Sequence, residues 1–190
     1  MKRLSVLFAV IFSACASRPV PLDPMVWHAE SLKATEAAAA GSPASGSAAE
    51  KAAVEKFRAF FGDLREDMIK KEIRSVYAPE VRFNDTLKSI QGVETLEHYL
   101  VETARNVESC KVEIEEVLTS SSGVYVRWRM GIRFKKFHKG TTQESIGMSH
   151  LRFDKEGRVV YHQDYWDSGA NLFEKIPVLG SGIRAVKRRL

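Results

Sequence analysis

Cysteine is scarce in this sequence, and its scarcity limits how the fold can be stabilised. The 190 residues contain two cysteines, Cys15 and Cys110. Because Cys15 lies in an N-terminal targeting segment, Cys110 has no partner in the folded part of the chain, and we expect no intrachain disulfide. Cys110 falls between a helical and a strand-like segment, where a small buried hydrophobic residue is a better interpretation than a nucleophile.

The apolar run at the N-terminus is too short to span a bilayer. It extends from Leu4 to Phe12, follows a basic start and precedes small residues, which is typical of a secretory targeting segment. The segment resembles a bacterial lipoprotein signal, in which Phe12-Ser13-Ala14 would precede a lipidated Cys15. An ordinary secretory signal cut near Ala14 or Ala16 is the alternative.

The lipoprotein resemblance implies acylation of Cys15 and stable anchoring in a lipid bilayer, because several acyl chains on one residue hold more firmly than one. Ala16, rather than Asp, follows the cysteine. In such proteins this implies the outer membrane of a bacterial envelope, with the domain facing the periplasm. Residues 1–15 are therefore predicted to be a signal peptide with its lipobox cysteine.

Residues 16–49 contain few large apolar side chains and are rich in Ala, Ser, Pro and Gly. Such a composition cannot bury enough apolar surface to offset the entropy of ordering. We predict a disordered tether here, although Met25 and Trp27 fit it poorly and could contact the domain or the lipid. The remaining residues, 50–190, are long enough for one domain with a sizeable core.

Acidic residues are absent from the run Arg127 to Lys139, which holds six of the 29 lysines and arginines of a chain with a formal net charge of +5. A nucleic-acid-binding surface usually interleaves such cations with exposed aromatic side chains. Here Trp128 and Phe134 alternate with arginines on a predicted strand and should point inward while the charges point outward. We therefore expect no nucleic-acid partner.

The hydrophobic pattern of residues 50–190 predicts an α+β fold. Helices are expected from about Glu50 to Leu64, from about Met68 to a stop at Pro79, and over Thr95–Val107. Strands are expected over Val81–Asp85, Lys111–Thr119, Val124–Phe137, Thr141–Phe153 and Val159–Asp167. The last four strands should form a meander of antiparallel hairpins.

The last predicted strand has an unusual polar face. Alternation places Val160, His162, Asp164 and Trp166 on one side of the sheet, and Val159, Tyr161, Gln163 and Tyr165 on the other. An imidazole, a carboxylate and an indole in a row are uncommon in a plain core strand. We expect the functional site on that face.

The segments YAPEVRFND, GVETLEHYL and LRFDKEGRVVYHQDYWD occur in an order that resembles the NTF2-like superfamily, and within it the SnoaL-like proteins. The resemblance implies a cone formed by a strongly curved antiparallel sheet, wrapped by N-terminal helices around a pocket. The superfamily includes ketosteroid isomerases, polyketide cyclases, epoxide hydrolases and non-catalytic binding proteins, so the fold alone does not fix a function.

The isomerase pattern is only partly present. Its general base matches Asp85 and its protonated oxyanion-hole carboxyl matches Ser149, while its first-helix tyrosine is replaced by Phe57, Phe60 and Phe61. The carboxyl and the tyrosine are the hydrogen-bond donors that stabilise the enolate, and this chain has neither at the matching positions. Steroid isomerisation is therefore disfavoured. Asp85 could equally be a turn residue that accepts backbone N–H groups.

Two functions stay open. The first is a pocket protein that binds a small apolar or lipid-like molecule through Trp128, Ile132, Phe134, Ser149 and Trp166. The alternative is a cofactor-free isomerase, cyclase or hydrolase that uses Asp85 with His162 and Asp164 for acid–base chemistry. His162 and Asp164 could instead be a structural polar pair that bonds to neighbouring strands. No cofactor is expected, and no metal, because nothing fixes a third ligand. A homodimerising domain is a further possibility.

The C-terminal residues predict a short basic helix with an apolar stripe of Ile183, Val186 and Leu190. A stripe of this kind usually packs on the edge of its own domain. Contact with a membrane surface or a partner is the alternative.

Overall fold

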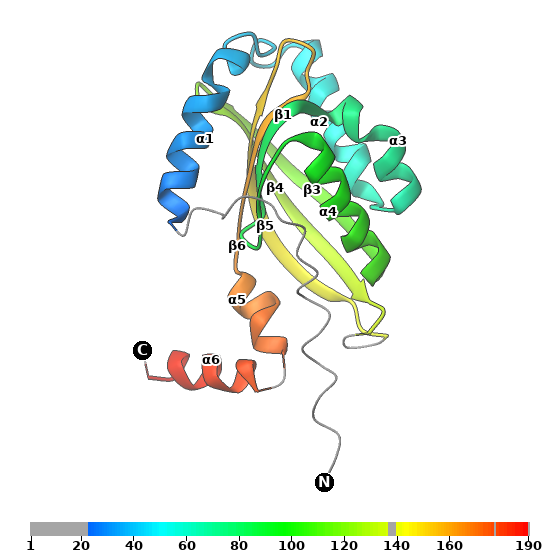
Figure 1. Cartoon of the computed structure of the whole chain (residues 1–190), viewed down its shortest axis with the longest axis vertical. Helices are drawn as coiled ribbons and strands as arrows, with labels where there is room; N and C mark the ends of the chain where they lie inside the picture. The colour runs from blue at the N-terminus through cyan, green and yellow to red at the C-terminus, as the bar shows by residue number, and fades with distance from the viewer. Residues whose placement is uncertain (1–22, 137–139, 177, 190) are drawn as a thin grey trace.

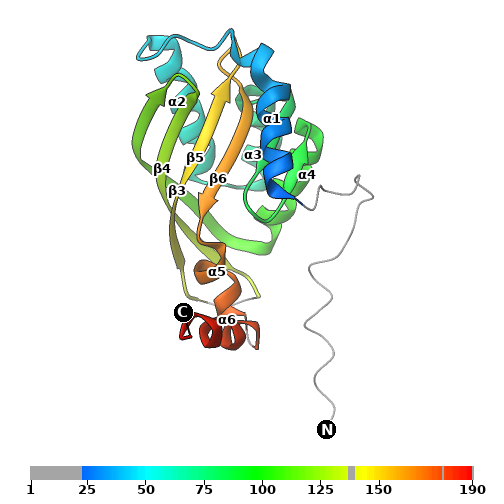
Figure 2. The same ribbon diagram turned by 90° about the vertical axis from the view of Figure 1, so that its left-hand side faces the viewer.

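One sheet of six strands organises the molecule, with helices on both of its faces (Figures 1 and 2). The computed structural model describes residues 23–136, 140–176 and 178–189. The helices are α1 (Pro24–Ala39), α2 (Ala48–Gly62), α3 (Glu66–Val76), α4 (Val93–Asn106), α5 (Ser168–Asn171), the 3-10 turn η1 (Phe173–Lys175) and α6 (Leu179–Lys187). The strands are β1 (Tyr77–Asn84), β2 (Ser89–Gln91), β3 (Val107–Ser120), β4 (Gly123–Phe134), β5 (Gln143–Phe153) and β6 (Val159–Trp166).

The strand order is β2-β1-β6-β5-β4-β3. The predicted α+β class and the meander from β3 to β6 are confirmed, because each consecutive pair in it is antiparallel. The expectation of a wholly antiparallel sheet is wrong, since β1 pairs with β6 in parallel. Helix α4 crosses the sheet and leads to β3 at the edge opposite β2, where the meander starts. The last strand of the meander, β6, then lies beside β1 and runs in the same direction.

Strand β1 starts earlier than the pattern predicts. Pro79 was expected to end a helix, but α3 ends at Val76 and Pro79 lies within the strand. The β1–β6 register shifts between Tyr77 and Arg82, around Pro79. A proline lacks the N–H that a regular ladder needs, so an irregular stretch of pairing is where a strand tolerates it.

The main core lies between the inner face of the sheet and helices α2, α3 and α4 (Figure 1). The predicted helical faces supply it, with Phe57, Phe60 and Ile73 almost fully buried. Cys110 is buried in the same core, and burial raises the pKa of its thiol to about 11. The interpretation of Cys110 as a buried hydrophobic residue is therefore confirmed.

Helix α1 corrects the prediction of a disordered tether. It packs on the opposite face of the sheet from α2, α3 and α4, against β1, β5 and β6 (Figure 2). Trp27, Ser31 and Thr35 form its buried face. Their spacing of four residues brings them to one side of a helix. The signal was missed because two of the three residues are small and polar.

Two polar contacts also fasten α1 to the sheet. The Arg152 guanidinium donates to the Leu32 carbonyl at 2.9 Å, and the Tyr161 hydroxyl lies 2.8 Å from His28 Nδ1. The folded unit therefore includes α1 and is not limited to the residues after Glu50. The predicted signal peptide, Cys15 and residues 16–22 of the predicted tether lie outside the described residues. Within the described part of the chain, no helix has the length and apolarity that a membrane span requires.

Docking of α1 predicts a specific loss of stability. Replacing Trp27 by Ala should lower the free energy of unfolding by about 3 kcal/mol, because it removes a buried aromatic ring from the contact between helix and sheet. Urea unfolding monitored by circular dichroism would measure it. The matched control is Met25→Ala on the same helix, where the side chain is exposed and the change should stay within about 0.5 kcal/mol. Equal effects of the two substitutions would mean that α1 does not stabilise the domain.

Candidate functional site

Strand β6 does present its polar residues on the inner face of the sheet, as the alternation predicts. His162 contacts the rings of Phe57 and Phe61 on α2, whereas Tyr161 faces α1. The prediction fails at the start of the strand, where Val159 rather than Val160 joins the main core. The register between β5 and β6 shifts beside it, which changes the alternation.

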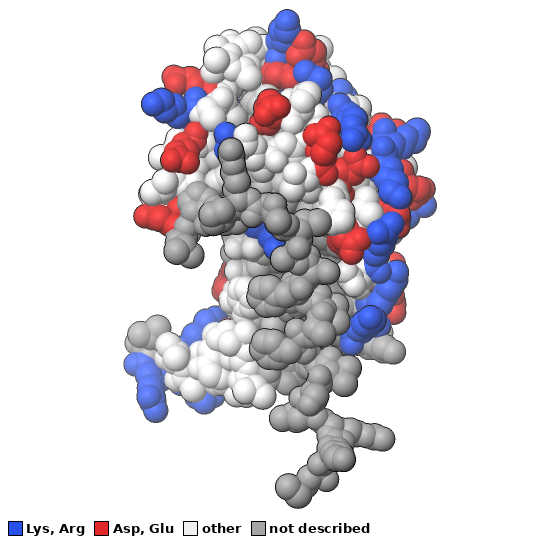
Figure 3. Space-filling model, in the orientation of Figure 1, with Lys and Arg blue, Asp and Glu red and all other residues white. Residues whose placement is uncertain are grey.

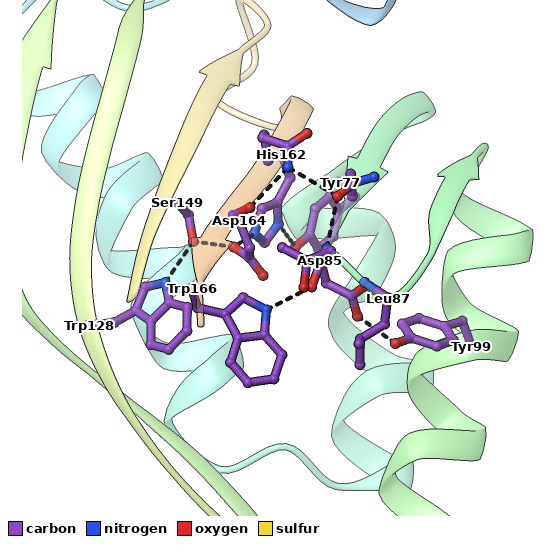
Figure 4. A network of polar contacts seen from close by, with 12 residues as sticks. Tyr77, Asp85, Leu87, Tyr99, Trp128, Ser149, His162, Asp164 and Trp166 are labelled. Carbon is purple, nitrogen blue, oxygen red and sulfur yellow. Dashed lines mark hydrogen bonds and ion pairs between the residues drawn. The ribbon is translucent and has the colours of Figure 1, made fainter. Parts of the chain in front are cut away.

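A chain of hydrogen bonds runs across the four strands β4, β5, β6 and β1 on this inner face (Figure 4). Trp128 Nε1 donates to Ser149 Oγ at 2.9 Å, and the Ser149 hydroxyl donates to Asp164 Oδ1 at 2.5 Å. His162 Nε2 lies 2.7 Å from the same oxygen, and its Nδ1 lies 2.8 Å from the Tyr77 hydroxyl. A neutral imidazole with its proton on Nε2 satisfies this whole chain, donating to Asp164 and accepting from Tyr77.

Burial divides this chain into supporting and accessible members. The side chains of Trp128, Ser149 and His162 are buried, with His162 only 2% exposed, so they hold the network rather than meet a ligand. The Asp164 side chain is 16% exposed and is the member open to solvent. The polar atoms of Trp128 and Ser149 are occupied within the protein, and their contact with a ligand stays a prediction.

Asp85 follows β1 and joins two sets of contacts. Its Oδ1 accepts the backbone N–H groups of Leu87 and Lys88 at 2.9 and 2.8 Å, as the turn interpretation proposed. Its Oδ2 accepts the Tyr99 hydroxyl at 2.5 Å, and its carbonyl accepts Trp166 Nε1 at 2.8 Å (Figure 4). The Asp85 carboxylate thus closes the turn through one oxygen and binds a residue of α4 through the other.

The strand pairing brings Asp85 and Asp164 to neighbouring positions on the inner face of the sheet. Asn84 pairs with Gln163 in the parallel β1–β6 ladder, so the next residues along each strand, Asp85 and Asp164, are neighbours. Figure 4 shows the Asp164 carboxylate beside Ser149 and His162, and the Asp85 carboxylate beside Leu87 and Tyr99. In the described part of the chain, neither carboxylate forms an ion pair with a lysine or arginine. The site is therefore rich in hydrogen-bond acceptors.

Burial raises the pKa of the Asp85 carboxyl, and the charge of Asp164 raises it further, while the Tyr99 and backbone hydrogen bonds act in the opposite direction. Burial and the neighbouring Asp85 charge also raise the pKa of Tyr99. Tyr99 therefore stays a neutral donor when Asp85 ionises. A carboxyl with a raised pKa beside a second carboxylate is a feature of functional sites, and also of strained structural ones.

The remaining predicted residues extend the site along β4. Ile132 and Phe134 alternate on the same face as Trp128 and are partly buried against the main core. Met130, between Trp128 and Ile132 on that face, is also partly exposed. With Phe61 they leave apolar surface on the inner face of the sheet. Ile132 and Phe134 thus lie further along β4 than Trp128, the member of the polar network on that strand.

Tyr77 and Tyr99 are the members that the sequence interpretation missed. Tyr99 falls within the helix predicted over Thr95–Val107, and a tyrosine hydroxyl that is buried requires a partner. That requirement was the available signal, and Asp85 meets it. Tyr77 gave no such signal because it was assigned to a helix end rather than to the start of β1.

Two cavities of the described residues lie away from this network. One of about 400 Å³ sits between the end of α1, the start of α2 and the β3–β4 hairpin. A smaller one of about 200 Å³ is lined by Arg129, Glu144, Ser145, Ile146 and Asn171. Neither cavity is lined by a predicted site residue, so a ligand site at the polar network stays a prediction. No cluster of three His, Cys, Asp or Glu side chains suited to a metal occurs among the described residues.

Family comparison assigns the fold. Residues 54–162, more than half of the chain, match the model of the SnoaL-like domain. The chain belongs to the SnoaL-like domain family. No curated protein shows significant similarity to it.

Solved structures confirm the NTF2-like fold of this SnoaL-like protein, with an open mixed sheet. An NTF2-like protein of unknown function from Burkholderia pseudomallei superposes with a TM-score of 0.58 at 14% identity, covering 70% of this chain and 100% of that one. An LEH-like epoxide hydrolase from M. tuberculosis gives 0.53 at 15% identity, covering 73% and 96%. A protein with a ketosteroid isomerase-like fold from Catenulispora acidiphila, in complex with trimethylamine, gives 0.54 at 17% identity, covering 63% and 88%.

The contacts of Asp85 predict two opposite pKa changes. Tyr99→Phe removes a hydrogen bond to the ionised carboxylate and should raise the pKa of Asp85. Asp164→Asn removes a neighbouring negative charge and should lower it. The carboxyl carbon shifts of aspartate, followed by NMR against pH, would report both, with Asp85→Asn to assign the signal. An Asp85 pKa that ignores both substitutions would contradict the described geometry.

Proposed function

We propose that this SnoaL-like domain binds a small, largely apolar molecule whose polar end donates a hydrogen bond to the Asp85–Asp164 pair. One observation supports this most strongly: Asp85 and Asp164 occupy neighbouring strand positions next to partly exposed apolar side chains, and no lysine or arginine of the described residues pairs with them. Asp164 Oδ1 is occupied by Ser149 and His162, and the side chain remains partly exposed. An apolar body would cover the surface of Trp166 and Phe61.

The solved relatives are consistent with a small ligand. The ketosteroid isomerase-like protein was crystallised with trimethylamine, and the M. tuberculosis relative is described as an epoxide hydrolase. At 15–17% identity these likenesses concern the fold. The acceptor-rich pair of this chain supplies the independent reason to expect a ligand with a donor group, such as an alcohol or an amine.

The second candidate is a cofactor-free enzyme in which Asp85 accepts a proton. Its raised pKa favours this role, since a general base works best when its pKa lies closer to the operating pH. The contacts of Tyr99 favour binding instead. Its hydroxyl is directed to Asp85 itself, so it is not offered to a developing oxyanion on a substrate.

Ligand binding is tested with probes of one chain length and three head groups. Decanol and decylamine should bind in isothermal titration, and decanoate should bind much more weakly, because two carboxylates repel it. Trp166→Ala should weaken decanol binding by about 1–3 kcal/mol, the scale of one buried aromatic contact. The matched control is Tyr165→Ala, an exposed aromatic on the other face of the same strand, which should change little.

Equal affinities for all three probes, or equal effects of the two substitutions, would refute the proposed site. Native mass spectrometry of the protein purified from its own host would then identify the natural ligand. Asp85→Asn separates the two candidates once that ligand is known. Turnover that collapses while affinity survives would establish the enzyme, and an unchanged complex without turnover would establish the binding protein.

We also propose that Cys15 is lipidated and holds the domain on the bacterial envelope, most simply on the periplasmic side of the outer membrane. The support is the signal-like sequence before Cys15. Globomycin should make the precursor accumulate, and Cys15→Ser should abolish labelling with radioactive palmitate. A wild-type chain that takes up no label and is processed normally with globomycin would exclude lipidation.

A further inference from the structure

Helix α6 packs on the protein through its polar face. Its main contacts are with η1, the turn just before it, at the lower end of the molecule in Figures 1 and 2. The Arg184 guanidinium donates to the Glu174 carbonyl at 2.9 Å, and Lys187 Nζ lies 2.5 Å from the Glu174 carboxylate. Gly180 lies on the same side, where a Cβ atom would meet the Glu174 carbonyl at 1.8 Å. The absence of a side chain at Gly180 thus allows this close approach.

The apolar stripe of α6 is consequently turned outward. Leu179, Ile183 and Val186 share a face at helical spacing, and Leu179 and Val186 are 47% and 60% exposed. Just before the helix, Val178 is 86% exposed and has a positive φ of 71°. A surface helix ordinarily buries its apolar stripe, so the expected packing of this stripe on the domain edge is wrong for Val186, while Ile183 is half-buried. Leu190, the last predicted member, lies outside the described residues.

Two cations stand next to the exposed stripe. Arg188 and Arg189 follow the helix, are exposed, and form no ion pair with any described residue. The arginines of β4 behave differently, since Arg127 and Arg129 both pair with Glu115 on β3. Figure 3 shows the contrast, with mixed charges over the upper domain and blue atoms beside white ones at the α6 end.

We propose that α6 lies on an anionic lipid surface, with Leu179 and Val186 inserted at the level of the headgroups and Arg188 and Arg189 bound to the lipid phosphates. An amphipathic helix with an apolar stripe and flanking cations has the chemistry of an interfacial helix. Charge complementarity favours anionic lipid over a second copy of the chain, whose own arginines would repel. The area also favours lipid, because a helix of nine residues offers far less than the roughly 800 Å² per partner of a stable dimer.

A fluorescent label that reports insertion tests the proposal on the full chain. Val186→Cys labelled with NBD reports the outward face, and Ser181→Cys is the matched control on the other side of the helix. Both carry Cys15→Ser, and Cys110 is buried, so the label attaches only at the new thiol. The N-terminal apolar run is identical in the two proteins. It therefore cannot produce a difference between the two labels.

Vesicles of phosphatidylcholine with phosphatidylglycerol should shift the emission of the label at position 186 to shorter wavelength. Nitroxide groups on the acyl chains should then quench that label and leave the label at 181 largely unaffected. Pure phosphatidylcholine should give a much smaller shift. Replacing Arg188 and Arg189 by Gln should raise the anionic lipid concentration for half the shift by about 25-fold, since each cation at such a surface contributes about fivefold.

Three results would overturn the proposal. Equal shifts with and without phosphatidylglycerol would show that α6 does not require anionic lipid. No shift at position 186 on either vesicle would show that the stripe does not insert. A shift that appears without vesicles and grows with protein concentration would identify a second copy of the chain as the occupant.

Discussion

The parallel pairing of β1 with β6 is the constraint on which the candidate site depends. It is the one parallel pair in the described sheet, and it sets Asp85 beside Asp164 although they are far apart in the sequence. All other strand pairs of the sheet are antiparallel neighbours along the chain. A shift of one residue in this pairing would turn one carboxylate to the α1 face, so the two residues would no longer share the inner face.

The buried part of the network makes that pairing specific. Phe57, Phe61, Phe83 and Tyr77 surround the His162 ring, and a polar ring buried among aromatics requires its hydrogen bonds to be satisfied. Tyr77 on the neighbouring strand β1 and Asp164, two residues further along β6, satisfy them. The same low-dielectric surroundings that strengthen these bonds also make a charged Asp85 costly. Stability of the fold and the perturbed acidity of the site therefore have one origin.

Much of the fold could be predicted from the sequence, because it is encoded in local periodicity. The α2–α4 helices, the four-strand meander and the shared face of His162, Asp164 and Trp166 all follow from spacing. Contacts that depend on another element could not be predicted in this way. The docking of α1 rests on small residues that give little hydrophobic signal, and the roles of Tyr77 and Tyr99 depend on partners brought by the sheet. The outward stripe of α6 depends on the close approach at Gly180.

The coupling between Asp85 and Asp164 tests this account most directly. A double-mutant cycle with Asp85→Asn, Asp164→Asn and both together, measured by urea unfolding at neutral and acidic pH, would report it. Adjacent carboxylates should give an unfavourable interaction of about 0.5–3 kcal/mol at neutral pH. Each substitution then stabilises the protein more in the wild-type background than in the other variant. The interaction should fade toward acidic pH, as protonation of Asp85 removes its charge. Additive effects at every pH would show that the two carboxylates are not neighbours and would contradict the parallel pairing that defines the site.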